Sequence, residues 1–270
     1  TDAAARASAN SGLGDTTMTM RISALLLGAT VLAGAASAQV RIEPFGEKAQ
    51  AGEERRLDAC SADRRRCAQL LREGESGPWR LKVGTRELPL PLGEPEGTDG
   101  PDLSLWPHVI SAEDGSALIG VEHMRRQSYS GGGAGVTTLT LVEAPANGGA
   151  LRIVAELPLQ GSAMIRACFD ERDARRRRGA CHDEYQFEAT LAPQADGRSA
   201  RPDLLLTTQA RTSPGRRSRF EENDRAIRRG EPAAWRDPTC SYRRLFTYDE
   251  ATARYQPDRP LPACRDYLEP

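Results

Sequence analysis

The chain is poor in the residues that most catalytic motifs require. Its 270 residues include only three histidines, and aromatic residues make up 5% of the sequence. Neither the Gly-x-Ser-x-Gly turn of α/β-hydrolases nor the His-Glu-x-x-His helix of zinc proteases occurs in it. The glycine-rich segment 131–135 lacks the Lys-Ser or Lys-Thr pair of a phosphate-binding loop. These absences exclude the commonest hydrolase and nucleotide-binding signatures, and we predict no cofactor.

An excess of charge of one sign is also missing. The 37 basic and 38 acidic residues leave a formal net charge of −1. A nearly neutral protein has no general electrostatic attraction to nucleic acids or to anionic membranes. We therefore predict no nucleic-acid partner. Lysine is almost absent, since only Lys48 and Lys82 occur, and arginine carries nearly all of the positive charge.

One long apolar run is present, over residues 22–34, and it has the features of an export signal. It follows Arg21, and the small residues of Ala36-Ser37-Ala38 come after it. A basic start, an apolar stretch and a small-residue cleavage site form a cleaved signal peptide. The run is shorter than the roughly 20 residues that a membrane-spanning helix needs. We predict cleavage before Gln39.

This signal defines the predicted organisation of the chain. Residues 1–17 are expected to be an upstream extension that is not native, and 18–38 to be the signal peptide. Residues 39–270 have a length that suits a single β-rich domain. No second apolar run of comparable length follows, so we predict no transmembrane segment in the mature chain. The predicted location is the periplasm or the secreted medium.

All six cysteines lie in the predicted mature chain. An even number of cysteines in an exported protein indicates disulfides. A metal site is the alternative, but the chain contains no Cys-x-x-Cys pair, and we predict no metal. Six cysteines allow 15 pairings, and their spacing forms three local couples. The predicted disulfides are Cys60–Cys67, Cys168–Cys181 and Cys240–Cys264.

Apolar and polar residues alternate in several segments, which is typical of half-buried β-strands. Turn-forming residues separate these segments, so we predict an all-β fold of short antiparallel strands. The predicted strands include residues 79–83, 136–142, 151–157, 185–191 and 204–208.

One short surface helix is expected over residues 218–229. Ser218 and Glu221 have the spacing of a capping box, in which each side chain bonds a free backbone N–H of the first helical turn. Few apolar residues follow them, so this helix is expected at the surface.

Two groups of residues resemble β-propeller blades of secreted bacterial proteins. Ser61-Ala62-Asp63 and Ser111-Ala112-Glu113-Asp114-Gly115 each precede an apolar strand, and they resemble the Ser-x-Asp-Gly turn of TolB-type blades. Asp196-Gly197-Arg198, followed by Asp203-Leu204-Leu205-Leu206, resembles FG-GAP or integrin-like blades. The resemblance implies a propeller-like arrangement. The same turn chemistry also serves ordinary hairpins, and that alternative stays open.

Two local clusters are candidates for function. His182 precedes Asp183 and Glu184, which offers a base beside carboxylates for a hydrolase of an envelope polymer. The run Arg175-Arg176-Arg177-Arg178 lies inside the predicted Cys168–Cys181 loop and is a candidate anion-binding site, with a solvated loop as the alternative.

These observations favour an exported, non-catalytic protein over an enzyme. We expect it to bind a partner protein or an anionic envelope ligand through its loops. The hydrolase using His182 is one alternative, and a structural subunit of an envelope complex is another.

Overall fold

The computed structural model covers most of the chain after residue 39. The predicted upstream extension and signal peptide lie outside the described residues, so the cleavage site stays a prediction. Side chains at 47–50 and 56 are not described. The described residues are 40–50, 56–72, 74, 77–91, 102–194, 201–221 and 226–270.

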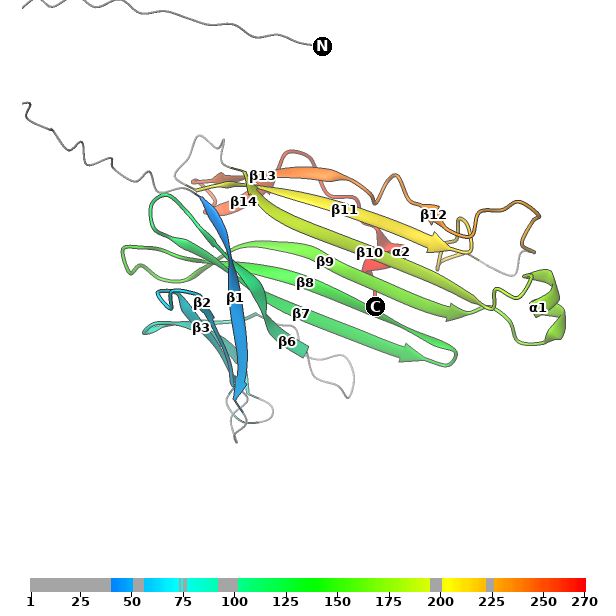
Figure 1. Ribbon diagram of the computed structural model, residues 1–270, viewed down its shortest axis with the longest axis horizontal. Helices are drawn as coiled ribbons and strands as arrows, with labels where there is room; N and C mark the ends of the chain where they lie inside the picture. The colour runs from blue at the N-terminus through cyan, green and yellow to red at the C-terminus, as the bar shows by residue number, and fades with distance from the viewer. Residues whose placement is uncertain are drawn as a thin grey trace, which may run out of the picture. The chain divides into compact units, whose positions relative to one another are not determined.

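Antiparallel strands make up most of the regular structure, which confirms the all-β prediction (Figure 1). The strands follow the order β14-β13-β11-β10-β9-β8-β7-β6-β1-β2-β3-β4-β5, and β12 pairs with β11. Within the described residues, the strands are β1 (Arg41–Gln50), β2 (Arg56–Ser61), β3 (Cys67–Arg72), β4 (Trp79–Val83), β5 (Arg86–Pro89), β6 (Asp102–Ser111), β7 (Ala117–Tyr129), β8 (Gly132–Ala144), β9 (Arg152–Arg166), β10 (His182–Gln194), β11 (Asp203–Ser213), β12 (Trp235–Arg236), β13 (Arg243–Asp249) and β14 (Arg254–Pro257).

The sheet has two hydrophobic cores, one on each face of β6, β7 and β8. Successive side chains of a strand point to opposite faces. In β7, Leu118 therefore packs into one core and Ile119 into the other. Strands β2 to β5 cover the second core, to which they contribute Leu70 and Leu81. Strand β1 links β2 to β6, because its first four residues pair with β6 and the remaining ones with β2.

The C-terminal segment covers the first core. Tyr267 in the short helix α2 (Arg265–Leu268) is 1% exposed, and its ring contacts those of Tyr185 and Phe187 in β10. A Cβ atom on Gly161 of β9 would lie 2.2 Å from the carbonyl oxygen of Tyr267. Glycine at this position is what allows α2 to approach β9 so closely.

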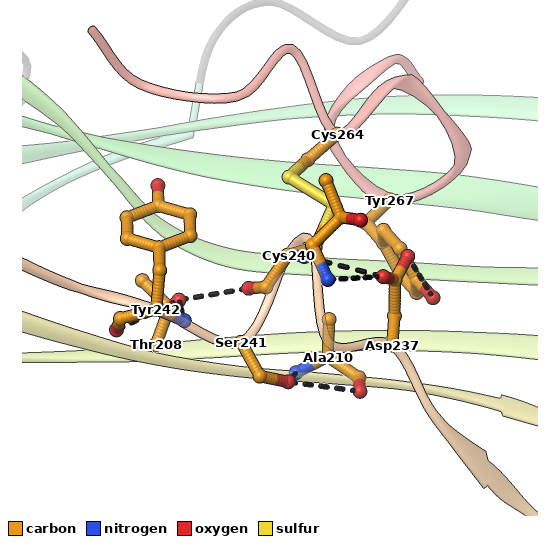
Figure 2. Close-up of a disulfide and its surroundings, with 9 residues drawn as sticks. Thr208, Ala210, Asp237, Cys240, Ser241, Tyr242, Cys264 and Tyr267 are labelled. Carbon is orange, nitrogen blue, oxygen red and sulfur yellow. Dashed lines mark hydrogen bonds between the residues drawn. A yellow bond between two sulfur atoms is a disulfide. The ribbon is translucent and has the colours of Figure 1, made fainter. Parts of the chain in front are cut away.

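A disulfide fixes this segment to the sheet (Figure 2). Cys264 directly precedes α2 and is bonded to Cys240. Thr208 of β11 donates a hydrogen bond of 2.8 Å to the carbonyl oxygen of Cys240. Asp237 accepts bonds from the Cys240 amide at 3.2 Å and from the Tyr267 hydroxyl at 3.3 Å. The disulfide and these bonds together hold the segment against β11 and β9.

All three disulfides join the pairs that the local spacing predicts. Cys60 and Cys67 are directly opposite each other on β2 and β3, so that bridge closes a hairpin. Cys168–Cys181 closes the loop that contains the helix α1 (Glu171–Arg176). Three disulfides are typical of proteins in an oxidising compartment outside the cytoplasm. No helix in the described ranges is long and apolar enough to cross a membrane.

The propeller-like arrangement is wrong for the part of the chain that the structure describes. Its strands pair in one continuous order and are not divided into separate blades. The two turns that resemble TolB-type blade turns join neighbouring strands, β2 to β3 and β6 to β7, and residues 196–198, which resemble an FG-GAP turn, lie outside the described residues. Asp63 and Asp114 each accept hydrogen bonds within their own turn. These bonds stabilise a hairpin turn, and such a turn can join two strands of a propeller blade or of a single sheet.

The expected helix over 218–229 is also wrong for its described residues. Residues 218–221 and 226–229 form turns and irregular chain, and 222–225 lie outside the description. Ser218 donates its hydroxyl to Asp266 at 3.0 Å, and the same carboxylate accepts the Arg219 amide at 2.6 Å. The polar groups of this segment thus bond to the C-terminal segment and do not cap a helix. The segment offers few apolar residues to stabilise a helix by packing.

Candidate functional site

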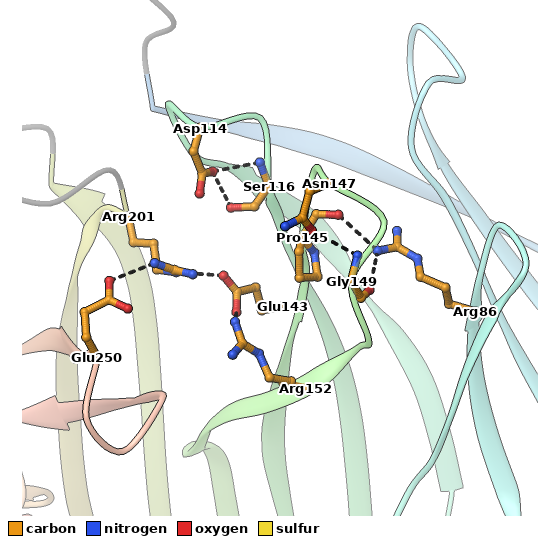
Figure 3. Close-up of polar contacts among 10 residues, drawn as sticks. All are labelled: Arg86, Asp114, Ser116, Glu143, Pro145, Asn147, Gly149, Arg152, Arg201 and Glu250. Carbon is orange, nitrogen blue, oxygen red and sulfur yellow. Dashed lines mark hydrogen bonds and ion pairs between the residues drawn. The ribbon is translucent and has the colours of Figure 1, made fainter.

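A cavity of about 500 Å³ lies where three connections meet, and four charged side chains line it (Figure 3). Asp114 comes from the β6–β7 turn, while Glu143 and Arg152 flank the β8–β9 turn. Arg201 comes from the residues just before β11. The cavity has the size of many small-molecule sites, which span roughly 300–1,000 Å³.

The Glu143 carboxylate is the centre of this site. Its side chain is 1% exposed and lies between two guanidinium groups. Arg152 donates from Nη2 to Oε2 at 2.6 Å, and Arg201 donates from Nε to Oε1 at 2.7 Å. Glu143 and Arg152 are direct cross-strand partners on β8 and β9, so the sheet register itself places this pair together. A buried carboxylate needs such partners, because burial without them is strongly unfavourable.

Arg201 connects this centre to the β13–β14 turn. Its Nη1 group lies 2.8 Å from Oε1 of Glu250, and its guanidinium lies 4.2 Å from the ring centre of Tyr248. Burial alone lowers the pKa of Arg201, but the hydrogen bond and charge of Glu143 outweigh it and raise that pKa. Burial also raises the pKa of Tyr248. The arrangement holds Arg201 in place as a positive charge that lines the cavity.

The β8–β9 turn, which forms one wall, is held by side-chain bonds to its backbone. Arg86 at the start of β5 donates from Nη1 to the carbonyl oxygens of Pro145 at 3.0 Å and Gly149 at 2.9 Å. Asn147 accepts the Gly149 amide at 3.0 Å. These bonds fix the wall before any ligand arrives, and preorganisation lowers the free-energy cost of binding.

The four arginines predicted to bind an anion do not share one environment. Arg175 pairs with Glu171 on the exposed surface of α1, at 3.1 Å. Arg177 is instead buried, where it donates to the Asp183 carboxylate and, at 2.9 Å, to the Ala180 carbonyl oxygen. Arg176 and Arg178 are not buried, so the run is divided between the protein interior and its surface.

The His182 cluster is divided in the same way. His182 and Glu184 are exposed on one face of β10, and Asp183 is buried on the opposite face, as the period of a strand predicts. Burial raises the pKa of Asp183, and the charges of Arg177 and Arg217 oppose that rise. None of the three residues of this cluster lines the Glu143 cavity.

Sequence reasoning did not find the Glu143 site. One signal was present, because Glu143 directly follows the predicted strand 136–142, and a carboxylate that is buried with such a strand needs a partner. Arg201 lies 58 residues further along the chain, and nothing in the sequence connects the two. Within the described ranges, no three His, Cys, Asp or Glu side chains are grouped to hold a metal ion.

Comparisons with family models, with curated proteins and with solved structures find no match to this chain. The structure shows an antiparallel β-protein with three disulfides and a cavity between its turns that charged side chains line.

Proposed function

We propose that this chain is an exported, non-catalytic binding protein that takes a small polar ligand in the Glu143 cavity. The observation that carries the proposal is the cavity itself, with a buried carboxylate held between two guanidinium groups. Most small-molecule sites are preformed in this way, with a few polar groups placed to orient the ligand.

Export is the second part of the proposal. It is supported by the signal-like segment 18–38 and by the three disulfides. The periplasm and the secreted medium both fit these features.

Binding is favoured over hydrolysis by the chemistry of the cavity. A hydrolytic site brings a nucleophile, a base and an orienting group to one place. Here the guanidinium groups hold Glu143 through both of its oxygens, and His182 does not line the cavity. The charged groups are arranged to recognise a ligand by hydrogen bonds and charge.

We expect Arg152→Gln to weaken ligand binding about tenfold, since charge-assisted hydrogen bonds contribute roughly 1.5–3 kcal/mol. Ligands are first identified by thermal-shift screening of amino acids, dicarboxylates, sugar phosphates and short peptides. Titration calorimetry on the parent and the variant then measures the affinity. Glu143 keeps its bond to Arg201 in this variant, so the fold should persist.

Arg126→Gln is the matched control. Arg126 forms an exposed ion pair with Asp102 at 3.6 Å and does not line the cavity. Its replacement should leave binding unchanged. If Arg152→Gln binds every ligand as the parent does, or if no compound in the screen binds, the proposed site is wrong.

We expect the exported protein to begin at Gln39. Expression of the whole chain in a bacterium with a periplasm, followed by N-terminal sequencing of the periplasmic fraction, measures this directly. Ala38→Pro should block processing, because the signal peptidase reads small residues at that position. A processed protein that retains residues 22–36 would contradict the prediction.

A further inference from the structure

We infer that the Glu143 cavity recognises a zwitterion of the short-peptide type, with a carboxylate at one end and an ammonium group at the other. The inference rests on the proposed function and specifies its ligand. It follows from two opposite charges, those of Arg152 and Asp114, which both line the cavity but form no ion pair with each other in the described structure.

Arg152 supplies the positive end. Its side chain is 44% exposed, and only Nη2 is bonded to Glu143. In the described part of the chain, its Nε and Nη1 groups have no acceptor. Arg152 pairs with Glu143, whose carboxylate is shared with Arg201, and the exposed Glu250 is bonded to Arg201. A guanidinium N–H group without another acceptor can donate a charge-assisted hydrogen bond to a carboxylate, which makes Arg152 the anchor for an anionic group.

Asp114 supplies the negative end. Its Oδ1 atom accepts the amide of Ser116 at 2.8 Å and the Ser116 hydroxyl at 2.5 Å, which fixes the carboxylate in the turn. Its other oxygen accepts no hydrogen bond from the described residues. An exposed carboxylate with one oxygen held in place is suited to receive an ammonium group.

The separation of the two ends is the decisive feature. Asp114 and Arg152 line the same cavity, yet no ion pair joins them in the described structure. Figure 3 shows the Arg201–Glu143 pair between them. A single ligand that satisfies both ends must therefore carry both charges on one molecule. A cavity of about 500 Å³ has room for a tripeptide, and the alanine and proline side chains of the β8–β9 turn would contact small apolar side chains.

Four forms of one peptide test the inference, namely trialanine, N-acetyl-trialanine, trialanine amide and the doubly blocked peptide. Calorimetric titration at about pH 6 keeps the free amino group charged, since its pKa is roughly 8. We expect trialanine to bind best. Blocking either end should weaken binding about tenfold, because a charge-assisted hydrogen bond is lost.

Two variants assign each end of the peptide to its residue. With Asp114→Asn, trialanine and N-acetyl-trialanine should bind equally, since the partner of the ammonium group is gone. With Arg152→Gln, trialanine and trialanine amide should bind equally. Arg126→Gln should retain the full difference among the four peptides.

The outcomes separate this inference from the proposed function. Equal binding of all four peptides, or equal binding of trialanine and its N-acetyl form by the parent, would overturn the zwitterion and leave a binding site. If none of the four peptides binds, but another compound from the screen binds in a way that depends on Arg152, the zwitterion is again overturned and the binding site remains. Failure of every compound overturns both.

Discussion

Replacing Asp183 by alanine is expected to lower the free energy of unfolding by about 3 kcal/mol or more. Removing one partner of a buried ion pair typically costs roughly 3–5 kcal/mol, because the remaining charge stays in a poorly solvated place. The carboxylate of Asp183 and its two charged neighbours are all buried: the Asp183 side chain is 1% exposed, and those of Arg177 and Arg217 are 2% exposed. Arg217 has its Nε atom 3.7 Å from the carboxylate and is bonded to Glu231 at 2.9 Å.

The Asp183 network also joins two loops to the start of β10. Arg177 belongs to the α1 loop, and Arg217 to the segment after β11. The amide of Ile227 donates to the Arg176 carbonyl oxygen at 3.1 Å, so the two loops also contact through their backbones. Loss of Asp183 should therefore loosen both loops as well as destabilise the sheet. Hydrogen exchange of the backbone amides in both loops would show this local opening.

Urea unfolding of the parent and of Asp183→Ala measures the effect on stability. Arg175→Gln is the matched control, because Arg175 lies in the same loop but forms an exposed pair with Glu171. Exposed pairs contribute about 0–1 kcal/mol, so this control should unfold as the parent does. If both variants lose equally little stability, the buried pair does not hold the loops.

The double substitution Cys240→Ala/Cys264→Ala is expected to have an effect of similar size. A disulfide restricts the unfolded chain, and closing a loop of this length is worth about 3.5 kcal/mol at a sequence separation of 24. Both cysteines are buried in the first core, so the substitution also removes packing there. The C-terminal segment with Tyr267 should then separate more readily from β9 and β10.

Urea unfolding under non-reducing conditions measures this second effect. Cys60→Ala/Cys67→Ala is the comparison, because that bridge closes a shorter loop, with a sequence separation of 7, between strands that are already paired. The chain-entropy relation gives it about 2.5 kcal/mol. A greater loss from the Cys60–Cys67 bridge than from Cys240–Cys264 would contradict our account of how the C-terminal segment is held.

Two wrong predictions have a common physical origin. The Asp-containing turns near residues 61–66 and 111–116 bond within themselves, so they carry no information on whether strands form blades or one sheet. The capping-box spacing of Ser218 and Glu221 likewise describes a helix start without the apolar face that keeps a helix in place. In both cases the residues fit a local motif, a turn or a helix start, but that motif does not determine the larger structure that was predicted from it.

The length of the central strands was also hidden in the sequence. The glycine-rich segment 131–135 lies almost entirely within a strand, because β8 begins at Gly132. A Cβ atom on Gly132 would lie 2.0 Å from the Met164 carbonyl oxygen, so glycine allows β8 to pass close to β9 here. This requirement comes from the neighbouring strand, and the local sequence does not show it.

What the sequence by itself determined about this protein is its local structure. The alternation of apolar and polar residues predicted the strands, because successive side chains of any strand point to opposite faces. Local spacing paired the cysteines, because the partners of each couple are only 7, 13 and 24 residues apart. The same alternation separated Asp183 from His182 and Glu184. These inferences hold because each depends on residues that are close to one another in the sequence.

Only the tertiary structure decided where the charges meet. Glu143 and Arg152 are nine residues apart and joined by one hairpin, but Arg201 and Asp114 reach the cavity from distant connections. Arg177 and Arg175 have the same side chain and lie in one short run, yet one is buried and the other is exposed. Burial depends on which segments fold over a residue, and the free energy of a charge depends on burial. The candidate site is therefore a property of the assembled sheet.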